Sequence, residues 1–354
     1  MNFKLLHLNL VIQTKWKMHP AIPIGLVFFG CCSNVIFLEA LVKVYPNSGN
    51  TITFFAFLFN CLEGLFITTR FLTKKSAIPM KYYVVMVAFF FIVQTLNNYT
   101  LGFNIAMPLH MIFRAGSLIA NLILGVLILK RSYKPTKYLS VVLITIGIII
   151  CTIASSNQKE KMAGHTGDAA HDYMIWVIGL FLLVLSLFLS ARMGIFQEQT
   201  YAVYGKHPAE ALFYNHFLPL PGFLLLYSDI HRCFVEFNAS DPYMLPGIGG
   251  SLPWAWLWLI FITISQFICI RSVFVLTTEC TSLTVTLVVT LRKFISLVFS
   301  IIYFQNPFTV VHWIGAVLVF LGTLMFVEVF SRFEWYRRLE ASISREEEKK
   351  KREE

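Results

Sequence analysis

Basic and small polar side chains recur at helical spacing within two otherwise apolar stretches of the chain. In residues 106–129 they follow the steps i, i+4, i+7 and i+11, which share one helical face: His110, Arg114, Ser117 and Asn121. In residues 281–304 a similar stripe has Arg292 beside one of its members: Ser282, Thr286, Lys293, Ser296 and Ser300. Arginine binds phosphate oxygens through a planar fork, and lysine binds them as a point charge. The two stripes therefore predict a site for an anionic substrate such as a diphosphate.

A structural explanation for the arginines is also open. Arg114 can snorkel to lipid headgroups or pair with one of three acidic residues: Glu39, Glu198 or Glu279. Arg192 and Arg271 lie nearer the predicted cytoplasmic ends of their segments, so snorkelling is the first interpretation for both.

Polar groups that can read a base or a sugar recur in three other apolar stretches. They are Gln94, Asn97 and Asn98 in the third stretch, Tyr214, Asn215 and His216 in the seventh, and Gln266 in the eighth. Taken singly, such residues more often hold helices together than contact a ligand.

The usual chemistry of an enzyme that handles nucleotide sugars, such as a membrane glycosyltransferase, is missing. The sequence has no D-x-D, H-E-x-x-H or P-loop motif, and its four Asp residues all lie in predicted loops. We therefore expect no enzymatic activity, no metal site and no cofactor.

Membrane-spanning helices must position these residues. Of the 354 residues, 57% are hydrophobic and 14% are charged, whereas an average soluble domain is about 25% charged. Apolar runs long enough to span a bilayer recur at 20–42, 51–71, 82–102, 106–129, 138–155, 173–196, 209–227, 254–276, 281–304 and 310–330. The sequence thus predicts an all-α membrane protein with about ten transmembrane helices. Basic loops explain the net charge of +10, so we expect no nucleic-acid partner.

Basic turns set the expected orientation in the membrane. Lysine and arginine cluster after the second and fourth segments, which places these turns and both termini in the cytoplasm. The longest expected luminal loop, 228–252, then holds the glycosylation sequon Asn238-Ala239-Ser240. A second sequon begins at Asn98, at a membrane edge, and we expect it to stay unused. Seven cysteines without a C-x-x-C pair lie nearly all in apolar segments, and we interpret them as packing residues.

The second half of the chain resembles the first. Residues 37–40 (FLEA) are matched 159 residues later by residues 196–199 (FQEQ), and residues 137–147 are matched 175 residues later by residues 312–322. An odd number of spans in each copy inverts the second one, as in secondary transporters that bind their substrate near mid-membrane. The predicted divisions are an N-terminal extension (1–17), a first five-helix repeat (18–155), a luminal loop (156–172), a second five-helix repeat (173–330) and a charged cytoplasmic tail (331–354).

Four stretches resemble one family closely. They are residues 30–39 (GCCSNVIFLE), 104–125 (NIAMPLHMIFRAGSLIANLILG), 190–198 (SARMGIFQE) and 277–309 (TTECTSLTVTLVVTLRKFISLVFSIIYFQNPFT). They are similar to nucleotide-sugar transporters of the drug/metabolite transporter superfamily, in particular those for UDP-xylose and UDP-N-acetylglucosamine. The resemblance covers nearly everything from Met18 to Val329.

The resemblance implies a ten-helix, five-plus-five inverted-repeat fold and alternating access without ATP. The implied partners are a cytosolic nucleotide sugar and a luminal nucleoside monophosphate such as UMP, and a homodimer is plausible. Residues 213–216 (FYNH) are similar to the F-Y-N-N motif that contacts the nucleobase in relatives, with His216 as a departure that leaves the choice of base open. Arg114 and the Arg292-Lys293 pair fall where relatives carry lysines near the phosphates.

The sequence leaves two alternatives open. An exporter of cationic drugs or metabolites would be expected to present an apolar or acidic cavity, and the basic stripes argue against it. GDP-fucose or another nucleotide sugar stays possible, because base and sugar readout depend on geometry. The expected location is the endoplasmic reticulum or the Golgi, and the weakly dibasic C-terminus (KREE) favours the former.

Overall fold

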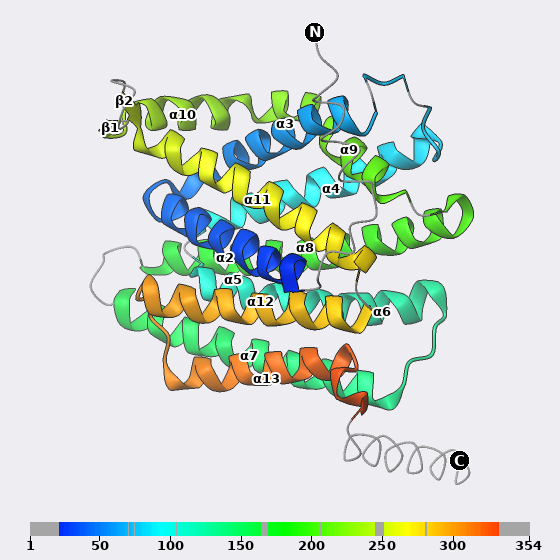
Figure 1. The fold of residues 1–354 in the computed structure, drawn as a ribbon. Helices are drawn as coiled ribbons and strands as arrows, with labels where there is room; N and C mark the ends of the chain where they lie inside the picture. The colour runs from blue at the N-terminus through cyan, green and yellow to red at the C-terminus, as the bar shows by residue number, and fades with distance from the viewer. Residues whose placement is uncertain are drawn as a thin grey trace. The chain divides into compact units, whose positions relative to one another are not determined.

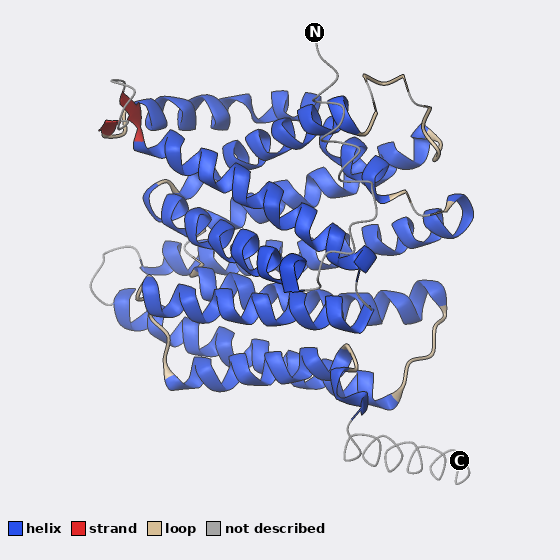
Figure 2. Cartoon of the chain, viewed as in Figure 1, coloured by secondary structure: helices blue, strands red, loops and turns tan. Residues whose placement is uncertain are grey.

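The computed structural model describes residues 21–69, 71–73, 75–103, 105–163, 169–205, 207–244, 251–279 and 282–332. Helices make up most of these ranges, together with one short two-stranded hairpin (Figures 1 and 2). Seven apolar segments of the described chain are long enough to cross a membrane. The prediction of an all-α, multi-pass membrane protein is therefore confirmed.

The first half of the chain forms five spans. Its elements are α2 (Ala21–Val44), η1 (Pro46–Ser48), α3 (Gly49–Ile67), α4 (Met80–Leu101), α5 (Met107–Phe113), η2 (Arg114–Gly116), α6 (Ser117–Leu129) and α7 (Pro135–Ala163). The second half contains α8 (Ala169–Tyr204), α9 (Pro208–Phe217), η3 (Leu220–Leu226), α10 (Tyr227–Asn238), β1 (Pro242–Met244), β2 (Ser251–Pro253), α11 (Trp254–Glu279), α12 (Ser282–Tyr303), α13 (Val310–Phe326) and η4 (Val329–Arg332).

The region after the seventh expected span, residues 228–252, is predicted to be a loop, but the structure shows a helix and a strand pair there. The helix that begins at Pro208 is interrupted after Phe217 by Pro219 and Pro221, which cannot donate the backbone hydrogen bonds of an α-helix. It continues as the 3₁₀ segment η3 and then as α10, which buries Cys233 and Phe237. The antiparallel pair β1–β2 follows. Only residues 245–250 of this region lie outside the described chain.

The chain forms two compact units, each built from both halves of the sequence. One comprises Met1–Leu41, Asn50–Ala88 and Thr200–Val285, and the other comprises Val42–Gly49, Phe89–Gln199 and Thr286–Glu354. We call them unit 1 and unit 2.

The expected loop at 156–172 is shorter than predicted at both ends, since α7 reaches Ala163 and α8 begins at Ala169. The predicted extension 1–17 and residues 333–354 of the predicted tail lie outside the described residues.

Within unit 2, α7 and α13 lie side by side along their length (Figure 1). A Cβ added to Gly147 would lie 2.6 Å from the carbonyl oxygen of Gly315, and one added to Gly322 would lie 2.9 Å from the carbonyl oxygen of Ser140. The 175-residue offset relates Ser140 to Gly315 and Gly147 to Gly322, so each contact is the image of the other. Reciprocal contacts between antiparallel helices require a two-fold axis perpendicular to both. This geometry supports an inverted repeat.

Replacing Gly147 with alanine should destabilise the protein. The new methyl group would meet backbone atoms of α13, which cannot move aside as a flexible side chain would. Overpacking of this kind typically costs about 1–3 kcal/mol, and we expect a lower melting temperature in detergent. The matched control is Gly25→Ala on α2, where a Cβ meets no atom within 4 Å. The control should be neutral or slightly stabilising, because alanine is the better helix former. Equal melting temperatures for both variants would contradict the prediction.

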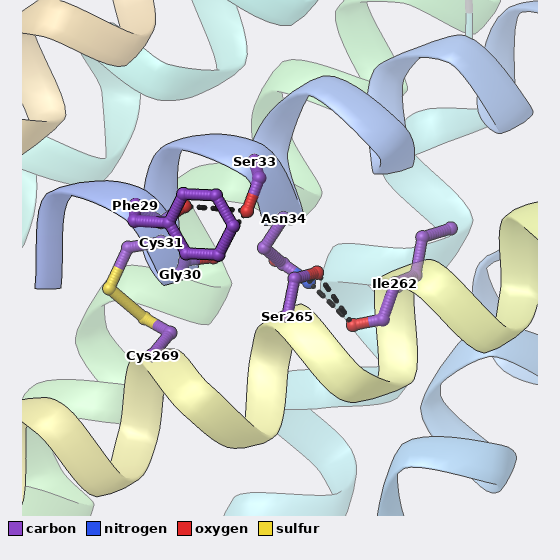
Figure 3. The surroundings of a disulfide bond; sticks show 8 residues. All are labelled: Phe29, Gly30, Cys31, Ser33, Asn34, Ile262, Ser265 and Cys269. Carbon is purple, nitrogen blue, oxygen red and sulfur yellow. Dashed lines mark hydrogen bonds between the residues drawn. A yellow bond between two sulfur atoms is a disulfide. The ribbon is translucent and has the colours of Figure 1, made fainter. Parts of the chain in front are cut away.

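A disulfide between Cys31 and Cys269 joins α2 to α11 within unit 1 (Figure 3). The two helices approach closely, since a Cβ on Gly30 would lie 2.8 Å from the backbone nitrogen of Cys269. Asn34 adds hydrogen bonds from its side-chain amide to the carbonyl oxygen of Ile262 (2.9 Å) and to the hydroxyl of Ser265 (3.3 Å). The interpretation of all cysteines as packing residues is therefore wrong for this pair, whereas Cys61, Cys151 and Cys233 are buried thiols.

Candidate functional site

The fourth span is broken at one of its cationic residues. The helix α5 ends at Phe113, and Arg114–Gly116 form the 3₁₀ turn η2 before α6 begins. Ile112 and Phe113 are buried in the core of unit 2, and Gly116 packs so closely that a Cβ there would lie 3.0 Å from Leu187. A 3₁₀ turn within a helix often marks a functional position, and transporters build substrate sites from discontinuous spans. The break therefore holds Arg114 between two anchored points.

Arg114, Arg292 and Lys293 form a cationic cluster in unit 2. The charges of Arg114 and Arg292 lie close enough to repel each other, and Lys293 experiences both of them. Arg114 and Lys293 are exposed although both lie within apolar spans, and neither forms an ion pair with an acidic side chain of the described residues. A charge at the centre of a span costs about 2.5–3.5 kcal/mol. An anionic ligand would offset both this cost and the mutual repulsion.

Two acidic side chains of the apolar helices pair with arginines outside the cationic cluster. Glu198, one of the candidate partners of Arg114, instead accepts two hydrogen bonds from Arg131, one of them at 3.2 Å. These bonds raise the pKa of Arg131, which lies in the turn after the fourth span. In unit 1, Arg271 pairs with Glu63 and lies 5.5 Å from the ring centre of Phe267, so the snorkelling interpretation is wrong for Arg271.

Arg192 has one guanidinium nitrogen, Nη1, that is buried and has no hydrogen-bond partner among the described residues. Snorkelling by the rest of this half-buried side chain stays a prediction.

His110 does not share the exposure of Arg114. Its side chain is buried, and its Nε2 atom lies 3.0 Å from the hydroxyl of Thr100, which also donates to the carbonyl oxygen of Asn97 at 2.7 Å. The amide oxygen of Asn97 in turn accepts a hydrogen bond from Ser186. The tighter winding of η2 explains why the predicted polar face does not run evenly along the span. Ser117 is half-buried and Asn121 is exposed.

The stripe on α12 divides in a similar way. Lys293 is exposed and Arg292 is half-buried, whereas Ser296 and Ser300 are buried. The hydroxyl of Ser300 accepts a hydrogen bond from the side chain of Asn306 at 3.1 Å. Thr286 lies on α12, but its side chain is outside the described part of the structure.

The predicted base-reading motif, residues 213–216, lies on α9 in unit 1. Phe213 packs on Gly64, since a Cβ added to Gly64 would lie 2.7 Å from the ring of Phe213. The buried His216 places its Nδ1 atom 2.6 Å from the carbonyl oxygen of Leu212 and its ring against Phe57. Tyr214 is also buried, against Tyr83. Asn215 differs from all three, because its Oδ1 atom is buried without a hydrogen-bond partner in the described chain.

Three further predicted residues have varied surroundings. The backbone and Cβ of Asn98 pack on Gly49 in unit 2. Gln266 is half-buried on α11. Asn238, the candidate glycosylation site, is exposed at the end of α10, where its side-chain oxygen accepts a hydrogen bond from Trp256 at 2.8 Å. Glycosylation of Asn238 stays a prediction.

Tyr83 is completely buried and lies against Tyr214 of the predicted base-reading motif, but its residue type does not mark it in the sequence. Its position in an apolar helix gives no signal, because an aromatic residue there is expected in any packed interface. Among the described residues, no three His, Cys, Asp or Glu side chains gather as metal ligands would.

Comparison with known proteins identifies relatives over most of the chain. Residues 19–330 match the model of the UAA transporter family. The UDP-xylose and UDP-N-acetylglucosamine transporter of Danio rerio is 57% identical, over 89% of this chain and 95% of its own length. The nucleotide sugar transporter SLC35B4 of Homo sapiens is 55% identical over the same shares. The endoplasmic reticulum GDP-fucose transporter of Drosophila melanogaster is 50% identical over 86% of this chain and 89% of its own length.

Proposed function

Because this chain belongs to the UAA transporter family and is a nucleotide-sugar transporter, we propose that it carries UDP-N-acetylglucosamine and UDP-xylose from the cytosol into the lumen of the endoplasmic reticulum or Golgi. UMP leaves in exchange, by alternating access and without ATP. The observation that carries this proposal most directly is that Arg114 and Lys293, two cationic residues inside the spans of unit 2, form no ion pair with an acidic side chain of the described residues.

The cluster suits the diphosphate of a nucleotide sugar. Arg114 supplies a planar fork that matches two phosphate oxygens, and Lys293 supplies a compact charge. Because no acid neutralises these two side chains within the described residues, a phosphate dianion would gain their full attraction. UMP presents the same chemistry with one phosphate fewer, as a counter-substrate must.

Asn215 suits the base. Its unpaired amide oxygen can accept the N3–H of uracil while its amide nitrogen donates to a neighbouring uracil carbonyl. An unsatisfied buried acceptor costs about 1–3 kcal/mol, and a bound base would remove this cost. The helix α9 is anchored by the buried contacts of the residues that flank Asn215, which are Phe213, Tyr214 and His216.

Counterflow into proteoliposomes of purified protein tests this function. Vesicles preloaded with UMP or GMP would be offered radiolabelled UDP-N-acetylglucosamine, UDP-xylose and GDP-fucose in parallel. We expect uptake of both UDP-sugars only into vesicles that contain UMP. Uptake that is independent of internal nucleotide would contradict exchange, and uptake of GDP-fucose alone would contradict the substrate assignment.

GDP-fucose is the second candidate substrate. It is favoured by the 50% identity to the Drosophila melanogaster protein named for that sugar. Guanine presents an N1–H beside a carbonyl oxygen, as uracil presents its N3–H, so the side chain of Asn215 can bind either edge. The position at which α9 holds this amide then decides between the smaller and the larger base. Uptake of GDP-fucose into vesicles preloaded with GMP would support this alternative.

A further inference from the structure

The carboxylate of Glu210 connects α9 to the chain segment that precedes α4. Glu210 lies in the first turn of α9, and its Oε1 atom accepts hydrogen bonds from the hydroxyl of Ser76 (2.9 Å) and from the backbone nitrogens of Ala77 (2.9 Å) and Ile78 (3.3 Å). Its Oε2 atom accepts a second hydrogen bond from the nitrogen of Ala77 (3.0 Å). An acidic side chain in the first turn is also stabilised by the helix dipole.

The same carboxylate holds Tyr83, a residue of α4. The hydroxyl of Tyr83 donates to Oε1 at 3.0 Å, and its ring lies 4.6 Å, centre to centre, from the ring of Tyr214. Glu210 and Tyr214 are four residues apart on α9 and so share one face of the helix. The carboxylate of Glu210 thus holds two partners of α9 in place. One is the backbone of residues 76–78, and the other is the ring of Tyr83, on which Tyr214 packs.

Asn215 follows Tyr214 directly and carries the unpaired buried oxygen. We infer that Glu210 is a positioning residue for nucleobase recognition, which fixes the rotation of α9 through Tyr83 and Tyr214 and so aims the amide of Asn215 at uracil. This inference rests on the proposed function. It goes beyond a helix cap, because a cap alone would stabilise α9 without affecting which base is preferred.

Two variants loosen this arrangement to different degrees. Glu210→Ala removes every hydrogen bond that the carboxylate accepts, whereas Tyr83→Phe removes one hydroxyl and keeps the ring against Tyr214. We expect Glu210→Ala to raise the KM for UDP-N-acetylglucosamine about tenfold, with Tyr83→Phe in the same direction but smaller. In both variants the preference for UMP over GMP as internal nucleotide should shrink, while the maximal exchange rate per folded molecule changes by less than about twofold.

Conservative and control variants complete the experiment. Glu210→Gln keeps one acceptor oxygen for Tyr83 and Ser76 and should restore part of the base preference. Glu236→Ala removes an exposed carboxylate on α10, so its KM and base preference should equal those of the unmodified protein. The amount of folded protein is measured for each variant by size-exclusion chromatography.

The outcomes separate this inference from the proposed function. If the unmodified protein exchanges UDP-sugars but Glu210→Ala and Tyr83→Phe keep its KM and base preference, Glu210 is a structural cap and the inference is wrong. If Glu210→Ala does not fold, Tyr83→Phe alone decides by the same criteria. If the unmodified protein exchanges no nucleotide sugar, the proposed function itself has failed.

Discussion

Alanine in place of Arg114 or Lys293 should reduce UDP-sugar exchange at least about a hundredfold, because each variant removes a charge-assisted contact to the phosphates. A bound substrate would cover these side chains, and truncating one member of a buried, hydrogen-bonded charge pair costs about 2–5 kcal/mol, of which 2.7 kcal/mol is about a hundredfold. Both side chains are exposed within their spans and lack an acidic partner in the described structure, so their removal should leave the fold intact. Counterflow with radiolabelled UDP-N-acetylglucosamine measures the loss.

Two conservative single variants, Arg114→Lys and Lys293→Arg, refine this result. Lysine cannot reproduce the planar fork of arginine, so Arg114→Lys should keep only part of the exchange activity that Arg114→Ala loses. Lys293→Arg should keep a larger part of the activity that Lys293→Ala loses. The control is Lys75→Ala, which removes an exposed lysine before α4. Normal exchange by Arg114→Ala or Lys293→Ala would exclude that residue from phosphate binding.

Replacing Asn215 with aspartate should shift the preferred base from uracil toward guanine. Aspartate accepts two hydrogen bonds, and guanine offers two adjacent donors, the N1–H and the N2 amino group. Uracil offers one donor between two carbonyl oxygens, which a carboxylate repels. An unpaired or repelled buried polar group costs about 1–3 kcal/mol, so we expect the KM for UDP-sugars to rise roughly tenfold or more.

Counterflow driven by UMP or by GMP in the same preparation measures this shift as a ratio, so differences in protein yield cancel. His216→Asn is a matched control that restores the amide found in the F-Y-N-N motif at the adjacent position. It should change the ratio less than Asn215→Asp, because His216 is already bonded to the carbonyl oxygen of Leu212. An unchanged ratio for Asn215→Asp would mean that Asn215 does not contact the base.

The spans were predictable because hydrophobicity over about 20 residues is a strong and local signal. Gly147 and Gly322 hold equivalent places in the sequence, and the structure adds the reciprocal contacts that explain both glycines. The inverted repeat as a whole stays a prediction. The break at Arg114 was not predictable. No proline marks it, and it depends on how Phe113 and Gly116 pack against distant helices.

Arg114 and Lys293 stand out in the sequence because a charged side chain inside an apolar span costs free energy. Helical spacing could not separate His110 from Arg114, because one is buried against Thr100 and the other is exposed. Glu210 was missed for a related reason. It lies at a helix start, where an acidic residue is ordinary, and its partners in residues 76–83 are more than 120 positions away.

The disulfide of unit 1 has a consequence for biosynthesis. Cys31 and Cys269 are 238 residues apart. At a synthesis rate of about 5–20 residues per second, the thiol of Cys31 waits roughly 10–50 s in the membrane for its partner. By then the ribosome has already made residues 89–199, the longest stretch of unit 2. Among the described helices, α2 is the first to be made, yet its disulfide can form only after α11 has been made. A chain cut short before residue 269 would leave Cys31 as a free thiol open to mispairing.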